Sequence, residues 1–167
     1  MKRIIAAILL STAFAAPAFA ADSPFYVGAM AGDAFIGIFG GYQIDKMFSV
    51  EAHYSKVLTP DTSAFGQTWK TDNSNIGVEG VALFPLNIQK VPQLSVFAKA
   101  GLERSSTKVT YTNTGSPASN YTNTTTDLKL TLGGGAQYDF NSNLSVRAGV
   151  GLMGYHNDLY VAGIYKF

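Results

Sequence analysis

Glu51, His53 and Ser55 place a carboxylate, an imidazole and a hydroxyl at alternate positions of one short stretch. Such a set could support hydrolysis if the imidazole activated the hydroxyl. The surrounding residues alternate as in a β-strand, so the three side chains share one face. Neighbours on such a face are about 6.5–7 Å apart at the backbone, which is a poor start for a Ser–His hydrogen bond. We therefore interpret the three residues as part of a polar interior.

Charged residues recur at alternate positions of other apolar stretches, on the face opposite the apolar one. Both signs of charge are present, as a poorly hydrated interior requires. The two histidines, His53 and His156, have no paired spacing, so we predict no metal site and no cofactor. The charged residues of this face are Glu51, Glu79, Lys99, Glu103, Asp127, Lys129 and Arg147.

The stretches that position these side chains read as eight β-strands, because two kinds of residue alternate in each. Eight strands joined by hairpins predict an all-β fold, an eight-stranded antiparallel up-and-down transmembrane barrel. The last strand would be an aggregation-prone edge unless it paired with the first and closed the barrel. The predicted strands are Phe25–Gly32, Phe35–Ile44, Met47–Leu58, Ser74–Phe84, Leu94–Arg104, Asp127–Phe140, Leu144–Tyr155 and Leu159–Phe167.

Two long polar stretches, Thr59–Asn73 and Ser105–Thr125, are expected to be loops between the strands. In the second, weak alternation at Val109 and Tyr111 favours strands that run on to a tip near Pro117, whereas its Ser, Thr and Asn content equally favours disorder. Both stretches carry rings that would either anchor a partner or enter lipopolysaccharide. These rings are Phe65, Trp69, Tyr111 and Tyr121.

The first twenty residues have the organisation of a cleaved signal peptide. Lys2 and Arg3 form a basic start, an apolar segment follows to about Ala16, and Ala18-Phe19-Ala20 is a cleavage signal. We predict a signal peptide at 1–20 and a barrel domain at 21–167, so the protein leaves the cytoplasm.

Composition narrows the class of protein further. Without Lys2 and Arg3 the remaining segment has 10 basic against 11 acidic residues and no basic block, which excludes nucleic acid as a partner. The absence of cysteine removes disulfides as a source of stability in this exported chain. Charged residues are 14% of the chain, whereas a soluble domain has about a quarter. No apolar run beyond the signal is long enough for a transmembrane helix.

Aromatic residues of the apolar face decide which side of the barrel faces lipid. When the hairpins are laid up and down, these rings gather at one end, beside the shorter turns. A belt of Tyr and Phe at one rim is typical of a membrane barrel, and the short turns place that rim in the periplasm. The predicted periplasmic girdle is Phe25, Tyr42, Phe48, Phe84, Tyr138, Phe140, Tyr165 and Phe167.

Two stretches, Ile38–Ser55 and Gly134–Arg147, resemble hairpins of the OmpA transmembrane domain, and the whole chain follows that family's strand order. The chain also resembles the opacity/NspA group of bare barrels. The resemblance implies an outer-membrane barrel with an internal ion-pair network, but without a peptidoglycan-binding domain. A first-strand lysine of the family is Met30 here. The lumen network implied for this chain is Glu51, Arg147, Lys99, Glu79 and Gln137.

His53-Tyr54-Ser55 is similar to the His-x-Ser motif of a lipid A deacylase, although Lys56-Val57-Leu58 replaces the residues that follow the motif there. Because the pair faces the lumen, we predict that the protein is not an enzyme. We expect a monomeric structural barrel in the Gram-negative outer membrane that contacts membrane lipid and lipopolysaccharide and exposes two long loops. The alternative is a small porin-like channel gated by Glu51 and Arg147. The terminal strand resembles the signal read by the outer-membrane assembly machinery.

Overall fold

The computed structural model describes residues 23–167 except 60–61, 65–66, 114–119 and 154–158. The predicted signal peptide lies outside these residues. In the described part, nine strands form one antiparallel sheet, and no helix there has the length and apolar character needed to cross a membrane. The strands are β1 (Phe25–Gly32), β2 (Phe35–Gln43), β3 (Phe48–Val57), β4 (Thr62–Ala64), β5 (Gln67–Pro85), β6 (Leu94–Asn113), β7 (Tyr121–Asp139), β8 (Leu144–Met153) and β9 (Leu159–Lys166).

Eight of the strands close into a barrel. The order around the sheet is β3-β2-β1-β9-β8-β7-β6-β5, and pairing of β3 with β5 completes the ring. β9 pairs with β1 as predicted, with Tyr26 opposite Lys166 and Gly32 opposite Tyr160. β4 pairs only with β5 and lies outside the ring. Closure leaves the barrel without a free edge, which a lipid environment requires.

The barrel is inverted relative to a soluble protein, with an apolar outer face and with its buried charged side chains inside. On β3, Val50 and Tyr54 are 41% and 48% exposed, whereas Glu51 and Ser55 are 3% and 1% exposed. Successive side chains of a strand point to opposite faces, so one alternation sets both surfaces. An exposed apolar wall around a polar interior is the arrangement that lipid stabilises.

Short turns join the strands at the end where the girdle lies. Asp45 Oδ1 accepts hydrogen bonds from the backbone N–H groups of Met47 and Phe48, both at 2.7 Å. In the β7–β8 turn, Asn141 Oδ1 accepts from Asn143 and Leu144 N–H at 2.9 and 2.8 Å. Asp and Asn favour such turns because the side chain replaces a backbone acceptor.

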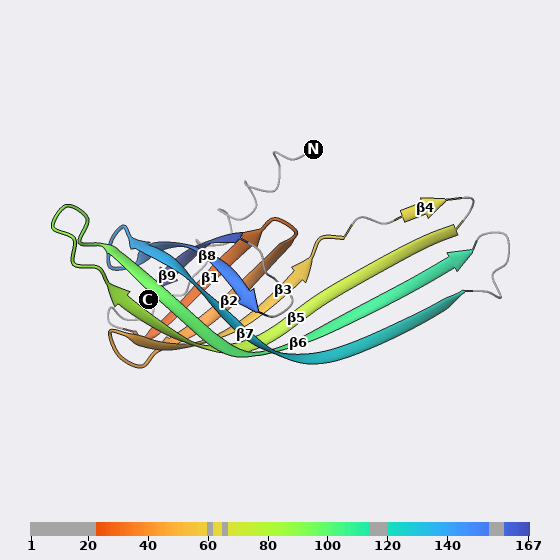
Figure 1. Cartoon of the computed structure of the whole chain (residues 1–167), viewed down its shortest axis with the longest axis horizontal. Helices are drawn as coiled ribbons and strands as arrows, with labels where there is room; N and C mark the ends of the chain where they lie inside the picture. The colour runs from red at the N-terminus through yellow and green to blue at the C-terminus, as the bar shows by residue number, and fades with distance from the viewer. Residues whose placement is uncertain (1–22, 60–61, 65–66, 114–119, 154–158) are drawn as a thin grey trace.

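At the opposite end, β5, β6 and β7 run far past the other strands as a curved three-stranded sheet (Figure 1). We call this sheet the extension. Its register is continuous with the barrel: Gln67 lies opposite Asn113, and Tyr111 lies opposite Tyr121. β8 and β9 stop near the barrel rim, so β7 has no partner on that side above Leu132 among the described residues.

The extension corrects the sequence prediction of two long loops. β5 begins at Gln67 rather than Ser74, β6 ends at Asn113 rather than Arg104, and β7 begins at Tyr121 rather than Asp127. For the second stretch, strands that run on to a tip are therefore correct; the tip itself lies outside the described residues. The strands lack apolar alternation because both faces of the extension meet water, and Thr, Ser and Asn can occupy either face.

Other strand ends within the described residues differ from the prediction by one residue. β2, β7 and β9 end one residue earlier than predicted, β5 ends one residue later, and β3 is shorter by one residue at each end. β8 ends at Met153, and the rest of the predicted strand lies outside the described residues. These differences fall at turns, where backbone pairing rather than residue pattern sets the boundary.

Candidate functional site

The lumen is filled by side chains. Large rings lie beside inward-facing glycines; a Cβ added at Gly41 would overlap the ring of Tyr26, and one at Gly28 would overlap the ring of Phe39. The interior of an eight-stranded barrel is just wide enough for side chains to fill it. The buried apolar residues are Tyr26, Met30, Phe35, Phe39, Val81, Phe97, Tyr160, Ala162 and Ile164.

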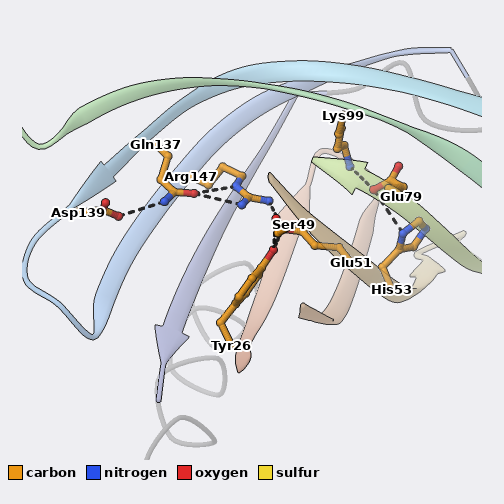
Figure 2. Close-up of polar contacts among 9 residues, drawn as sticks. All are labelled: Tyr26, Ser49, Glu51, His53, Glu79, Lys99, Gln137, Asp139 and Arg147. Carbon is orange, nitrogen blue, oxygen red and sulfur yellow. Dashed lines mark hydrogen bonds and ion pairs between the residues drawn. The ribbon is translucent and has the colours of Figure 1, made fainter. Parts of the chain in front are cut away.

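Arg147 on β8 is the centre of one polar cluster (Figure 2). Its Nη1 donates to Glu51 Oε1 at 2.7 Å, and its Nε and Nη2 donate to Gln137 Oε1 at 3.2 and 3.1 Å. The Tyr26 hydroxyl donates to the same Glu51 oxygen at 2.7 Å and contacts Ser49 Oγ at 2.8 Å. Arg147 and Glu51 are 4% and 3% exposed, so their charges are compensated inside the protein.

Two rings also contact the Arg147 guanidinium. Its carbon lies 4.8 Å from the centre of the Phe97 ring and 5.7 Å from the centre of the Phe39 ring. A guanidinium over an aromatic face is attracted by the ring's electrons, more strongly where water is excluded. Arg147 is therefore held between rings as well as by its ion pair, across the width of the lumen.

A second cluster surrounds Glu79 on β5 (Figure 2). Its Oε2 accepts from Lys99 Nζ at 3.0 Å, and its Oε1 accepts from Thr131 Oγ1 at 2.9 Å. His53 Nδ1 lies 3.5 Å from Glu79 Oε2, and His53 Nε2 lies 3.2 Å from Glu103 Oε2. Both ring nitrogens face carboxylates, so a protonated His53 would donate to both.

The two clusters separate two carboxylates that the register brings together. Glu51 on β3 lies directly opposite Glu79 on β5, and both point into the lumen. Like charges at facing positions repel each other. Glu51 turns to Arg147 and Glu79 turns to Lys99, which gives each carboxylate its own cation.

A third group lies at the end of the lumen with the short turns, beside a pocket that Gln137, Arg147 and Lys166 help to line. Asp139 Oδ1 lies 3.0 Å from Lys166 Nζ and accepts from Gln137 Nε2 at 3.0 Å. The Ser145 hydroxyl donates to the same oxygen. Because Gln137 also accepts from Arg147, this group continues the Arg147 cluster to the barrel rim.

The five residues expected in the lumen network all face inward and lie in these clusters: Glu51 pairs with Arg147, and Lys99 pairs with Glu79. From the sequence, His53 and Glu103 were expected on the inner face but without a partner, and Tyr26 and Asp139 had no expected role in the network. The alternation along each strand shows only that these side chains face inward. Which residues they contact depends on the register between strands. His53 and Ser55 form no dyad, because both imidazole nitrogens face carboxylates. Among the described residues, no group of His, Asp and Glu could hold a metal ion.

The residues of the predicted girdle lie on the outer face at the short-turn end. Ring contacts join neighbours there: the ring centres of Phe25 and Tyr42 are 5.1 Å apart, and those of Tyr165 and Phe167 are 5.3 Å apart. Tyr138 and Phe140 make a third such contact at 5.0 Å. Phe48 and Phe84 lie at the same end, at the start of β3 and near the end of β5.

The extension carries an aromatic row across its three strands. Trp69 lies opposite Tyr111, and Tyr111 lies opposite Tyr121. Their ring centres are 5.2 and 5.3 Å apart, and the two tyrosines are stacked. Trp69 and Tyr121 are 38% and 56% exposed. The row lies on the face that continues the lumen, near the tip; Phe65 lies outside the described residues.

Comparisons with known proteins agree with this architecture. Residues 6–165 match the family described as outer membrane protein beta-barrel domain. No curated protein matches the chain. The solved structure of Neisserial surface protein A (NspA) is similar at 17% identity and a TM-score of 0.60, covering 87% of this chain and 98% of NspA.

Two further solved structures share the fold. The N-terminal β-barrel domain of OprF from Pseudomonas aeruginosa has 16% identity and a TM-score of 0.54, covering 84% of this chain and 92% of that one. A major outer membrane protein of Thermus thermophilus has 14% identity and a TM-score of 0.52, covering 86% of this chain and 98% of that one. The chain belongs to the outer membrane protein β-barrel domain family and is an eight-stranded OmpA-like barrel of the outer membrane.

Proposed function

We propose that this protein is a structural outer-membrane barrel that uses its extension to recognise a ligand at the cell surface, for adhesion or envelope integrity. The observation that carries the proposal is the row of Trp69, Tyr111 and Tyr121. Exposed aromatic side chains are the residues that most often anchor a partner in a binding interface. The paired strands of the extension hold this row above the barrel rim, where a large ligand could reach it.

The part of this face between the ring row and Ser105 suits an uncharged, hydrogen-bonding ligand, whereas β7 adds exposed Asp127 and Lys129 closer to the lumen. The side chains of the first part are mainly hydroxyls and amides, which can donate and accept hydrogen bonds without the cost of removing water from a charge. Those between the row and Ser105 are Thr71, Asn73, Thr107, Val109, Asn123 and Thr125.

Adherence of a non-adherent laboratory strain to cultured epithelial monolayers tests the proposal. Cells that display the wild-type barrel should adhere, and the variant Trp69→Ala/Tyr111→Ala/Tyr121→Ala should return adherence to the level of the empty strain. The matched control is Thr110→Ala/Thr112→Ala/Thr122→Ala, which alters the opposite face of the same strands and should adhere like wild type. Equal adherence of wild type and the aromatic variant at equal surface display would contradict the proposal.

The filled lumen favours this role over the porin-like alternative. Arg147 spans the lumen between Glu51 and two rings, and opening a path would leave both charges without partners. In planar bilayer recordings, wild type and Glu51→Ala should both be silent. Stable conductance in the wild type would instead support the channel.

A further inference from the structure

The outer face of the extension has a different chemistry from the aromatic face. Outward positions of β5 and β6 above the apolar wall carry Lys70, Arg104 and Lys108, all exposed. At the same level β3 contributes Lys56, and the only carboxylate on this face within the described residues is Asp72. Four cations against one carboxylate give the face a net charge of +3.

Asp72 does not neutralise all four cations of this face. Lys56 Nζ lies 3.3 Å from Asp72 Oδ1, so this carboxylate already has a partner, and Lys108 is its direct neighbour across β5 and β6. Lys70 lies opposite Thr110, diagonal to Lys108. On β6, Arg104 and Lys108 are separated by four residues, or about 13 Å along the strand.

The cations begin where the lipid-facing wall ends. Arg104 lies opposite Ile76 on β5 and opposite Leu128 on β7, which are 58% and 67% exposed. Leu102, the preceding outward residue of β6, is 53% exposed. An apolar surface that changes to a basic one within two residues fits an amphiphile with acyl chains below and anionic groups above.

We propose that Lys70, Arg104 and Lys108 bind the phosphates of a phosphorylated glycolipid in the outer leaflet, while its acyl chains lie against Ile76, Leu102 and Leu128. We call these three cations the phosphate patch. The inner face of the extension would then remain free for a ligand. This site is independent of the aromatic row, so either proposal can fail without the other.

Binding of fluorescently labelled, bisphosphorylated lipid A to the purified barrel in neutral detergent micelles tests this site by anisotropy. Each cation near an anionic lipid surface contributes about fivefold in affinity, so Arg104→Gln/Lys108→Gln should bind about 25-fold more weakly. Arg104→Lys/Lys108→Arg keeps both charges and should bind like wild type. Lys46→Gln/Lys90→Gln removes two exposed cations near the short turns and should also bind like wild type.

Three competitors separate the sources of binding. Unlabelled bisphosphorylated lipid A should displace the probe, whereas lipid A without phosphates and inorganic phosphate at equal concentration should not. Equal displacement by the dephosphorylated lipid would reduce the site to acyl-chain contact, and displacement by inorganic phosphate would make it a general anion site; either result overturns the proposal. Unchanged affinity in Arg104→Gln/Lys108→Gln, with heat-modifiable gel migration intact, would overturn it as well.

Discussion

The strands β5, β6 and β7 pass through two environments, and the same inward face changes its chemistry between them. Inside the barrel, β6 presents half-buried Lys99, which pairs with Glu79, and buried Glu103, which contacts His53 Nε2 at 3.2 Å. Beyond the rim, the same face presents Thr107 and Tyr111, which need no charged partner. On β6, charges lie where the closed wall supplies partners and neutral side chains where water can reach them, whereas β7 carries exposed Lys129 and Asp127 on the same face above Leu132. We infer that the lumen provides stability and the extension provides contact with the exterior.

The largest loss of stability in the lumen should come from Arg147→Ala. The substitution leaves Glu51, 3% exposed, without its cation and removes the donors to Gln137. A stranded buried charge costs about 3–5 kcal/mol, so the free energy of unfolding should fall by that amount. Denaturant unfolding of the barrel in lipid vesicles measures it.

Removing both charges separates the stranded carboxylate from the loss of packing. Glu51→Leu/Arg147→Leu leaves no buried charge at this pair and should lose less stability than Arg147→Ala alone. If the denaturant midpoint of Arg147→Ala equals that of wild type, the pair does not stabilise the lumen.

A smaller effect should follow from adding one methyl group inside the lumen. A Cβ at Gly135 would overlap the Ala148 backbone oxygen and lie 2.9 Å from Cε1 of the Phe97 ring. Overpacking of this kind costs about 1–3 kcal/mol, so Gly135→Ala should lower the free energy of unfolding by that amount. Gly163→Ala is the control on the lipid-facing side, where a Cβ meets nothing within 4 Å. Equal stability of the two variants would show that the lumen is not tightly packed.

Much of the barrel can be predicted from the sequence, because a lipid environment imposes a residue pattern that is visible in a single sequence. Every wall strand must alternate apolar residues with residues for the interior, and β9 must find β1 to remove a free edge. The eight barrel strands and their inner and outer faces are therefore readable. The extension obeys no such rule, since both of its faces meet water: the strand at Gln67–Asn73 was missed, and for Ser105–Thr125 the sequence left continued strands and disorder as equal alternatives.

The ion-pair partners within the lumen could not be predicted from the sequence in the same way. Alternation shows that Glu79 and His53 face inward, but their contacts depend on the register of β3, β5 and β6 and on the curvature of the ring. His53 lies opposite Gly77, which leaves space for the imidazole to reach Glu103 on the next strand. The positions facing the lumen were thus predictable one strand at a time, whereas the ion pairs require the closed barrel.

Cysteine accessibility in intact cells tests the central claim most directly: the lumen and its wall span the outer membrane, and the extension lies outside the cell. The chain has no cysteine, so single substitutions give a clean background. With a membrane-impermeant maleimide, Thr110→Cys on the extension should label in intact cells. Ser142→Cys in the β7–β8 turn should label only after the outer membrane is permeabilised. Labelling of Ser142→Cys but not Thr110→Cys in intact cells would contradict this orientation, and labelling of both would contradict a membrane-spanning barrel.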